Sequence, residues 1–372
     1  MLISVVLPCR NEEDSIGSSI RDIKRVFKED NIDGEIIVSD SSNDRSAEIA
    51  GSLGVKVIKH NRVGYGIAYL EAFKHIKGRY VIMGDCDGSY NFSYIPRFLE
   101  LLKNYDLVIG NRFNYLMEKD AMNPLHRFVG NPLLGLVLRH LFKVKVRDPH
   151  SGFRAIKKDK LEKLSLKANG MEFATEMIIK AHKYGLNIKE VDIPYHKRKG
   201  YSKLNPFKDG WRHLRLMLLY SPNYLFLVPG LFLFSFGFIL TLVLLFGPIN
   251  LFGVNLVLHP MILGSLLTIL GYQIILLGVY AKIYAAIHLN EKDKLIDLIN
   301  KYANLEKGSL VGLFITLIGI LIAVRIIIIW SRGNFGILDQ IRPAIFVLTL
   351  VVIGIQTIFS SFLLSILGLE QE

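Results

Sequence analysis

The feature that most constrains this sequence is a change of solvent a little past its middle. The chain has 372 residues, and up to about Leu204 it mixes charged, apolar and turn residues as water-soluble proteins do. From Leu225 onward it carries four apolar runs of roughly 20 residues, a length sufficient for a helix to cross the hydrocarbon core of a bilayer. We therefore expect a soluble N-terminal part followed by an all-α membrane domain of four helices, at about 225–246, 260–281, 310–330 and 344–367.

The segment between these two parts has the composition of a helix that lies at a membrane surface. Between Phe207 and Tyr220, basic and aromatic residues alternate with leucines on a helical repeat. Such a helix buries its apolar face at the headgroup layer and keeps its charges in water. The predicted divisions are thus 1–204 for the soluble domain, 205–224 for an interfacial amphipathic helix and 225–372 for the membrane domain.

Lysines mark one of the membrane loops. Four of them, at positions 292, 294, 301 and 307, lie between the second and third spans, whereas the loop between the first and second spans has no Lys or Arg. Loops rich in these residues stay on the cytoplasmic side. We expect a multi-pass protein of the cell membrane with its N-terminal domain and both termini in the cytoplasm, although Arg325, Arg332 and Arg342 weaken the asymmetry.

The formal net charge of +12 indicates anionic partners. In a chain with membrane spans, anionic lipids and phosphate-bearing substrates are expected, and nucleic acid is not. The two cysteines, Cys9 and Cys86, provide no disulfide framework, as is typical of a reducing compartment. They end two expected strands that should be neighbours, so they should lie close together.

Short apolar runs alternate with amphipathic stretches through the first 110 residues, which predicts parallel βαβ units. The expected strands are Leu2–Pro8, Glu35–Asp40, Val55–Lys59, Tyr80–Gly84 and Asp106–Gly110. Further on, helices are expected over 132–142 and 172–184, and strands over 152–157 and 187–193. Ligands of open α/β sheets bind beyond the carboxyl ends of the strands, so the polar residues after each run are the candidates for a site.

Two carboxylates stand at one of these strand ends. Asp85-Cys86-Asp87 follows the fourth expected strand, and Gly88 frees the turn after it. Carboxylates separated by one residue can approach one hard cation together. Mg²⁺ or Mn²⁺ held in this way would bridge phosphate oxygens and offset the charge of a departing diphosphate. Asp-x-Asp also occurs by chance in turns, but its place after a buried strand favours the metal interpretation.

Seven segments occur in a fixed order along the chain: Val5–Glu13, Val38–Asp44, Gly64–Gly66, Asp85–Gly88, Ile109–Arg112, Asp148–Arg154 and Gly200–Leu204. Together they resemble glycosyltransferase family 2, and within it the dolichyl-phosphate mannose and dolichyl-phosphate glucose synthases. The resemblance covers most of residues 2–230. It implies a GT-A-type, Rossmann-like sheet and inverting, metal-dependent transfer of a hexose from a UDP-glucose or GDP-mannose type of nucleotide-sugar to dolichyl or polyprenyl phosphate.

The resemblance also implies roles for individual residues. The nucleotide-sugar would contact Pro8, Arg10, Glu12, Asp40, Asp85, Cys86, Asp87, Arg112, Arg198 and Lys203. Asp85 and Asp87 would hold the metal. The family often has Asp-Asp where this chain has Ser39-Asp40, and the mannose synthases usually continue the metal motif with Leu-Gln where this chain has Gly88-Ser89. The third metal ligand is therefore left between Ser89 and water.

Basic residues near the expected strand ends would form an anion site for a diphosphate and a lipid monophosphate, as Arg suits bidentate phosphate contact. The group consists of Arg112, Arg127, Arg154, Arg198 and Lys203. The acceptor phosphate would contact Arg112, Arg127, Asn131 and Lys203, and the catalytic residues would be Asp87, Arg112 and Arg127. Glu176 is left between a general base and a capping or arginine-pairing role. No metal role is expected for His60, His126 or His150, because no second ligand is suitably spaced.

Two other functions share parts of this pattern. A processive polysaccharide synthase also combines such a front half with membrane helices, but its Gln-x-x-Arg-Trp motif is absent from this sequence. A lipid-linked sugar transporter or flippase would need polar residues inside several spans. The hexosyltransferase therefore remains the leading expectation.

Overall fold

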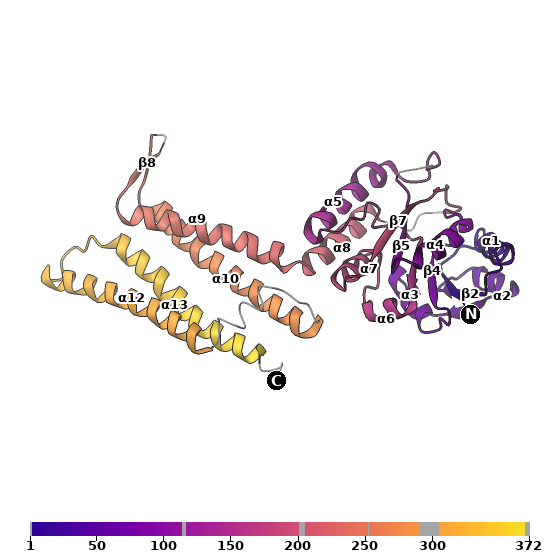
Figure 1. Ribbon diagram of the computed structural model, residues 1–372. Helices are drawn as coiled ribbons and strands as arrows, with labels where there is room; N and C mark the ends of the chain where they lie inside the picture. Colours follow the sequence, from indigo (N-terminus) through magenta and orange to yellow (C-terminus); the bar gives the residue numbers. More distant parts are fainter. Residues whose placement is uncertain (1, 114–116, 201–204, 252, 290–304, 369–372) are drawn as a thin grey trace. The chain divides into compact units, whose positions relative to one another are not determined.

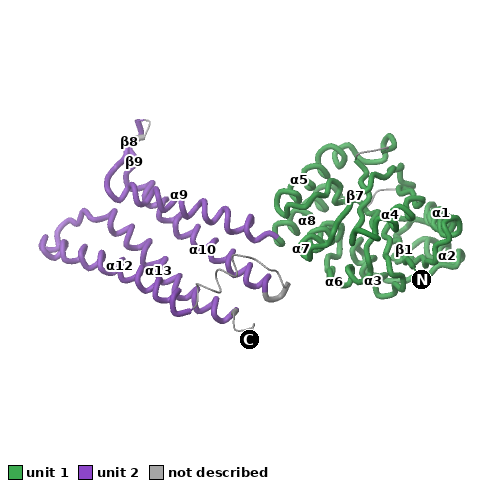
Figure 2. Tube along the Cα trace, viewed as in Figure 1, with its two compact units in different colours: residues 1–220 green, residues 221–372 purple. Residues whose placement is uncertain are grey.

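In the computed structural model the chain forms two compact units, residues 1–220 and 221–372 (Figure 2). The structure describes residues 2–113, 117–200, 205–251, 253–289 and 305–368. The first unit extends beyond residue 204 because helix α8 (Pro206–Leu219) packs against it, burying His213 and Met217. The helix expected at 205–224 thus ends at Leu219 and is part of the first unit.

A seven-stranded sheet, in the order β3–β2–β1–β4–β6–β5–β7, forms the centre of the first unit. Its strands are β1 (Ile3–Cys9), β2 (Gly34–Asp40), β3 (Lys56–Lys59), β4 (Tyr80–Met83), β5 (Leu107–Asn111), β6 (Arg154–Lys157) and β7 (Ile188–Asp192). The expected strands are all present, and the first five differ from their predicted bounds by one residue at most. Neighbours run parallel except at β6, which lies antiparallel between β4 and β5.

Helices cover both faces of this sheet (Figure 1). One core lies beneath α1 (Ile16–Glu29), α2 (Ser46–Ser52) and α4 (Ile95–Leu102), and the other beneath α3 (Tyr65–Phe73), α5 (Asn131–Phe142), α6 (Lys158–Leu164) and α7 (Phe173–Lys183). Helix α1 shows why: Ile16, Ile20 and Ile23 recur at helical spacing and are fully buried. An apolar stripe of this period can only be shielded from water by packing on the sheet.

Among the described residues of the second unit, four helices are long and apolar enough to cross a membrane: Asn223–Leu245, Leu258–Ala286, Leu305–Arg332 and Ile341–Leu367. They correspond to η3 (Asn223–Leu227) with α9 (Val228–Leu245), α10 (Leu258–Leu289), α12 (Leu305–Arg332) and α13 (Ile341–Gly368). The last three contain the spans expected from the sequence, and the first ends at Leu245, one residue before its expected end. A short hairpin of β8 (Ile249–Leu251) and β9 (Val254–Leu256), which was not expected, joins the first two.

Glycines allow the membrane helices to pack closely. A Cβ at Gly237 of α9 would lie 2.5 Å from the Thr268 nitrogen of α10, and one at Gly312 of α12 would lie 2.7 Å from the Gly354 oxygen of α13. Small residues at such positions bring helix backbones together, which drives association where lipid removes the hydrophobic effect.

Candidate functional site

The polar segments after β1, β2 and β4 meet at one edge of the sheet. Cys9 pairs with Asp40 between β1 and β2, and Val6 pairs with Met83 between β1 and β4, so these parallel strands end together. The two thiols are neighbours, as expected: the pKa of Cys86 is raised by its hydrogen bond with Cys9 and by burial. Cys86 Sγ also donates to the Pro8 carbonyl at 3.2 Å. These contacts place the thiols in the packing beneath the site.

Asp85 is the most perturbed carboxyl group of this edge. Its pKa is raised from 3.8 to about 7, first by burial and then by the charge of Asp87, while Arg112, Arg198 and a hydrogen bond from Tyr65 oppose the rise. One oxygen, Oδ1, is buried and has no hydrogen-bond partner among the described residues. The other, Oδ2, lies only 2.8 Å from where a side chain at Gly152 would begin, so glycine is needed there. The carboxyl group is thus held in place with one oxygen uncommitted.

Asp87 is tied to the segments around it. Its Oδ1 accepts hydrogen bonds from the Ser89 amide at 3.0 Å and the Ser89 hydroxyl at 2.5 Å. Its Oδ2 lies 3.5 Å from Nη2 of Arg198, which also contacts Glu12 Oε1 at 3.2 Å. Gly88 makes this turn possible, because its φ of +81° lies in the left-handed region. Arg198 therefore links the segment after β1 to the carboxylates after β4.

The residues expected around the base and ribose lie on the first two strands and their loops. Pro8 is in β1, Arg10 follows it on the surface, and Asp40 ends β2 with only 3% of its surface exposed. Ser42 joins the two loops, since its hydroxyl donates to Asp40 Oδ1 at 2.6 Å and accepts from the amide of Asn11 at 2.8 Å. The structure brings these residues to the same edge as Asp85 and Asp87.

The donor set suits a hard divalent cation that shares its coordination with a substrate. The uncommitted Asp85 Oδ1 and the neighbouring Asp87 carboxylate are both hard oxygen donors. Within the described residues, no group of three or more His, Cys, Asp or Glu side chains could complete a metal site. Mg²⁺ and Mn²⁺ are commonly bound by one or two carboxylates plus waters and substrate phosphates, so these two aspartates fit such an ion.

Arg112 lies beside the carboxylates, but most of its guanidinium is engaged. Its Nε and Nη2 donate to the two oxygens of Asp148 at 2.7 and 2.8 Å, and both side chains are buried. The guanidinium also lies over the Tyr195 ring at 5.1 Å. Asp148 thus takes one N–H of Nε and one of Nη2, out of the five N–H donors of a guanidinium. Asp148 and Tyr65 were not singled out by sequence reasoning, although both belong to segments that carry the resemblance.

Arg154 corrects one expectation. It was grouped with the phosphate-binding residues, yet it is 1% exposed, and its three nitrogens donate to backbone carbonyls. The acceptors are the oxygens of Ser151 at 2.7 Å, Ala174 at 2.7 Å and Pro149 at 2.6 Å. Arg154 therefore fixes the 148–152 loop rather than binding an anion, because a buried guanidinium needs every donor satisfied.

Arg127 and Asn131 stand one helical turn apart on the continuous segment of η2 (His126–Gly130) and α5, and both are partly exposed. The same segment exposes large apolar side chains, with 70% of Phe128, 58% of Leu133 and 57% of Leu136 accessible. Lys203, the other residue expected at the acceptor phosphate, lies outside the described residues.

Glu176 is surrounded by structural partners. Its carboxylate is 1% exposed and accepts from the amides of Lys167 and Ala168 at 2.8–3.0 Å, from Lys180 Nζ at 2.8 Å and from the Tyr220 hydroxyl at 3.3 Å. Of the two roles left open for it, these contacts favour the structural one, because backbone amides, a lysine and a tyrosine already engage both carboxylate oxygens.

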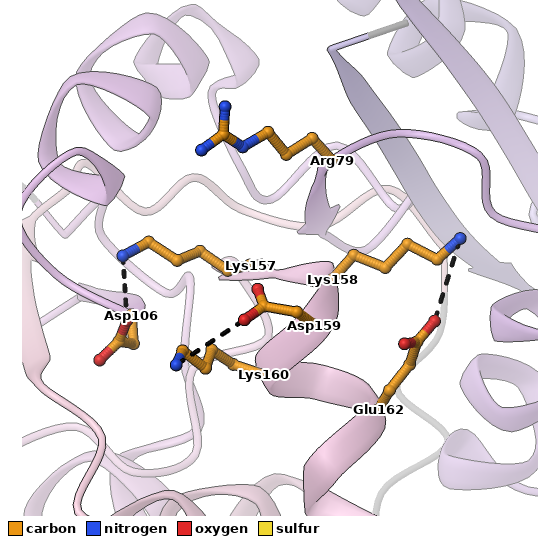
Figure 3. Close-up of a pocket in the computed structure, with 7 residues that line it drawn as sticks. All are labelled: Arg79, Asp106, Lys157, Lys158, Asp159, Lys160 and Glu162. Carbon is orange, nitrogen blue, oxygen red and sulfur yellow. Dashed lines mark hydrogen bonds and ion pairs between the residues drawn. The ribbon is translucent and has the colours of Figure 1, made fainter.

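A cavity of about 660 Å³ opens at the opposite end of the strands (Figure 3). It lies where β4 and β5 begin and β6 ends, and Figure 3 shows its three lysines each reaching toward a carboxylate. These pairs are Lys157 with Asp106, Lys158 with Glu162, and Lys160 with Asp159. Because they largely neutralise one another, the cavity lacks the concentrated charge of the other edge, and the site is assigned to the edge that carries Asp85.

Comparison with known proteins agrees with this assignment. The sequence model described as glycosyl transferase family 2 matches residues 4–165, and the model of the family 2 C-terminal transmembrane region matches residues 279–368. The low-salt glycan biosynthesis hexosyltransferase Agl6 of Haloferax volcanii is 38% identical over 368 residues, which is 98% of this chain and 89% of that protein. The chain belongs to glycosyltransferase family 2.

Two further similarities are found. The dolichyl-phosphate hexose transferase of Haloferax volcanii is 36% identical over 211 residues, covering 56% of this chain and 89% of that protein. A crystal structure of glucosyl-3-phosphoglycerate synthase from Mycobacterium tuberculosis in complex with Mn²⁺, uridine diphosphate and glucosyl-3-phosphoglycerate aligns with a TM-score of 0.47 and 25% identity, over 59% of this chain and 80% of that one. The GT-A-type sheet and the hexosyltransferase class expected from the sequence are thereby confirmed by the family matches and the relatives.

Proposed function

We propose that this hexosyltransferase moves its sugar from a nucleotide-sugar onto dolichyl or polyprenyl phosphate at the cytoplasmic face of the membrane, for glycan or lipid glycosylation. One observation carries the proposal. An edge of the sheet with two carboxylates and two arginines occurs in a unit whose η2–α5 segment exposes apolar side chains, in a chain whose described residues include four helices able to cross a membrane. The similarity to a dolichyl-phosphate hexose transferase supports it.

The donor side of the proposed site is the edge formed by β1, β2 and β4. Pro8, Arg10, Glu12 and Asp40 would line the base and ribose, with Cys86 beneath them. Buried carboxylates such as that of Asp40 discriminate between ligands because the wrong ligand leaves them unpaired. Arg198, already in contact with Glu12 and Asp87, would approach the diphosphate.

Asp85 and Asp87 would hold Mg²⁺ or Mn²⁺, which would stabilise negative charge on the leaving diphosphate. Ser89 hydrogen-bonds Asp87 and would orient that carboxylate, with waters and phosphate oxygens completing the coordination. Because Asp85 has a pKa of about 7, it would lose its proton when the cation binds, so cation affinity should rise with pH up to about 7.

The acceptor side would be the η2–α5 segment with Arg112. A lipid phosphate approaches from a membrane surface, and exposed apolar residues such as Phe128 and Leu133 are suited to contact such a surface. Arg127 and Asn131 lie on the same segment and would hold the phosphate, together with Arg112 Nη1 and Lys203. Arg127 would thus stand where the lipid headgroup meets the protein.

The proposed reaction is a single displacement. An oxygen of the acceptor phosphate forms a bond to the anomeric carbon as the bond from that carbon to the nucleotide diphosphate breaks, so the configuration inverts. No side-chain base is needed, because a phosphate monoester has a second pKa of about 6 and its oxygen is already an anion near neutral pH. The task of the basic residues is to hold two anions in line and to offset their repulsion.

Transfer into organic solvent tests this function. Purified protein would be incubated with polyprenyl phosphate and each of a panel of radiolabelled nucleotide-sugars, with and without Mn²⁺. Label should move into the lipid phase for one donor, and Mn²⁺ should be required. Failure of every donor to label the lipid would refute the proposal, and label in a growing water-soluble polymer would favour a processive synthase instead.

The proposed orientation needs a separate test. Cysteines placed singly at Asn250, in the β8–β9 hairpin, and at Asn300, between the second and third spans, should react with an impermeant maleimide from opposite faces. Cys9 and Cys86 are buried, so the parent protein should not be labelled by the maleimide. Labelling of both new cysteines from one face would refute the four-span topology with a cytoplasmic catalytic domain.

A further inference from the structure

His150 is a buried side chain that the proposed function does not yet use. Both of its ring nitrogens are buried, and neither makes a hydrogen bond within the described part of the chain. A neutral imidazole has one N–H donor and one acceptor nitrogen. Leaving both without partners is unfavourable, and such groups in native proteins call for an explanation.

Hydrogen bonds fix the backbone on both sides of His150. Arg154 donates to the carbonyls on either side, those of Pro149 at 2.6 Å and Ser151 at 2.7 Å. Asp148 is held by Arg112, and the Gly152 amide donates to the Tyr90 hydroxyl at 2.7 Å. The loop backbone that carries the imidazole is therefore held in place, which favours a preorganised binding group.

The neighbours of the ring place it on the acceptor side. Its closest aromatic contact is His213 of α8, with ring centroids 4.5 Å apart. His213 has a partner of its own, since its Nδ1 lies 2.7 Å from Thr175 Oγ1. Burial lowers the pKa of His150 well below its usual value, and the neighbouring His213, Arg112, Arg154 and His126 lower it further. The ring is thus neutral near pH 7. His213, whose pKa is lowered by burial to about 4, is neutral there as well, so the charged neighbours are the guanidinium groups of Arg112 and Arg154.

These surroundings favour an anion as the missing partner. A histidine with a purely structural role would be hydrogen-bonded, as His213 is. A metal ion is not favoured, because the described residues offer no group of three ligands around it. The nearby guanidinium groups attract negative charge, while the neutral imidazole can still donate its N–H. Phosphate oxygens accept such bonds readily.

We infer that His150 is an acceptor-binding residue, whose imidazole N–H donates a hydrogen bond to the phosphate group of the acceptor lipid. The inference rests on the proposed function and adds a residue to its acceptor side. In this role His150 would stand between Arg112, which is fixed by Asp148, and the η2 segment that carries Arg127. It would orient the phosphate for attack without taking a proton from it.

The test compares His150→Leu, His150→Asn and His150→Gln with the parent enzyme. Loss of one neutral hydrogen bond should raise the KM for polyprenyl phosphate roughly 3- to 10-fold, and the KM for the nucleotide-sugar should change less than about twofold. The Asn or Gln variant, whose amide N–H can replace one ring nitrogen, should recover most of the affinity. His182→Leu, on the exposed side of α7, is the matched control and should change neither constant.

Two competitors show which part of the lipid is bound. Inorganic phosphate should inhibit less well in the leucine variant by a similar factor, whereas polyprenol without phosphate should compete equally against both proteins. An unchanged lipid KM in His150→Leu, an equal rise in both KM values, or an equal loss of polyprenol binding would overturn the inference. If the leucine variant does not fold, the Asn and Gln variants provide the test. A loss of lipid affinity of more than about threefold in both of them would overturn the inference.

The parent enzyme separates this inference from the function on which it rests. If the parent transfers label to lipid and the variants behave like it, only the role of His150 fails. If the parent labels no lipid with any donor, the proposed function itself fails.

Discussion

Replacing Asp85 by Asn should increase the stability of the protein while removing its activity. Asp85 has a pKa of about 7 in the folded chain, against 3.8 for an ordinary aspartate. Burial and the charge of Asp87 disfavour the ionised form more than Arg112, Arg198 and Tyr65 favour it. Asparagine resembles the protonated acid and carries no charge, so it avoids this penalty but cannot supply a charged ligand to a cation.

Proton linkage determines which of the two proteins is more stable, and over which pH range. Below about pH 4 the acid is protonated in both the folded and the unfolded chain, and the two proteins should be equally stable. As pH rises from about 4 to 7 the unfolded chain ionises while the folded chain resists, so the parent protein loses stability relative to the variant. Above pH 7 the difference in the free energy of unfolding between the variant and the parent is constant, with an upper limit of about 4 kcal/mol. Because Asp85 is not fully enclosed, water screens part of it, and we expect about 2 kcal/mol.

Thermal unfolding of the purified full chain in detergent, in the presence of chelator, measures this difference. At pH 8 the midpoint of the catalytic unit should be roughly 4–8 °C higher in Asp85→Asn than in the parent, and the gap should close as pH falls toward 4. Asp22→Asn is the control, because Asp22 is 52% exposed on α1 and its replacement should give no such pH-dependent gain.

With added Mn²⁺, the parent protein should become more stable than Asp85→Asn. A cation at 100 times its dissociation constant stabilises the folded parent by about 2.7 kcal/mol, whereas the variant should respond weakly. A lower midpoint for Asp85→Asn at every pH would refute the assigned electrostatics. Equal stabilisation of both proteins by Mn²⁺ would refute the metal assignment.

Four further substitutions test other parts of the site. Asp87→Asn should remove most transfer of label to lipid while circular dichroism shows a folded protein, and chelator should reproduce the loss in the parent; full activity in chelator would contradict the metal role. Asp148→Ala should destabilise the catalytic unit by about 3–5 kcal/mol, because it leaves a buried guanidinium unpaired; a midpoint within error of the parent would show that this pair is not structural. Arg127→Ala should raise the polyprenyl phosphate requirement far more than the nucleotide-sugar requirement, in initial-rate measurements. Glu176→Gln should lower the unfolding midpoint yet retain turnover per folded molecule, and its complete loss of turnover would reinstate Glu176 as a base.

Much of the fold could be predicted from local patterns. Strands such as β1 and β4 are short apolar runs bounded by turn residues, and the spans are uninterrupted apolar stretches, so a few residues of context define each of them. The place of Asp85 and Asp87 at the sheet edge followed as well, because parallel strands share a carboxyl edge. The antiparallel insertion of β6 between β4 and β5 could not be predicted from the sequence, because no local signal encodes which strands pair when they are far apart in the chain.

The sequence by itself thus determined the division into a water-soluble and a membrane-compatible part, the family, and the chemical types of residue at the site. Only the tertiary structure decided which polar groups already have hydrogen-bond partners and which are available to a ligand. Arg112 and Arg154 are the same residue type, yet all three nitrogens of Arg154 donate to backbone carbonyls, while Nε and Nη2 of Arg112 donate to the carboxylate of Asp148. Glu176 is saturated by backbone amides, whereas Asp85 and His150 keep unpaired atoms. Hydrogen-bond satisfaction depends on groups far apart in the chain that meet only on folding, so it cannot be derived from spacing alone.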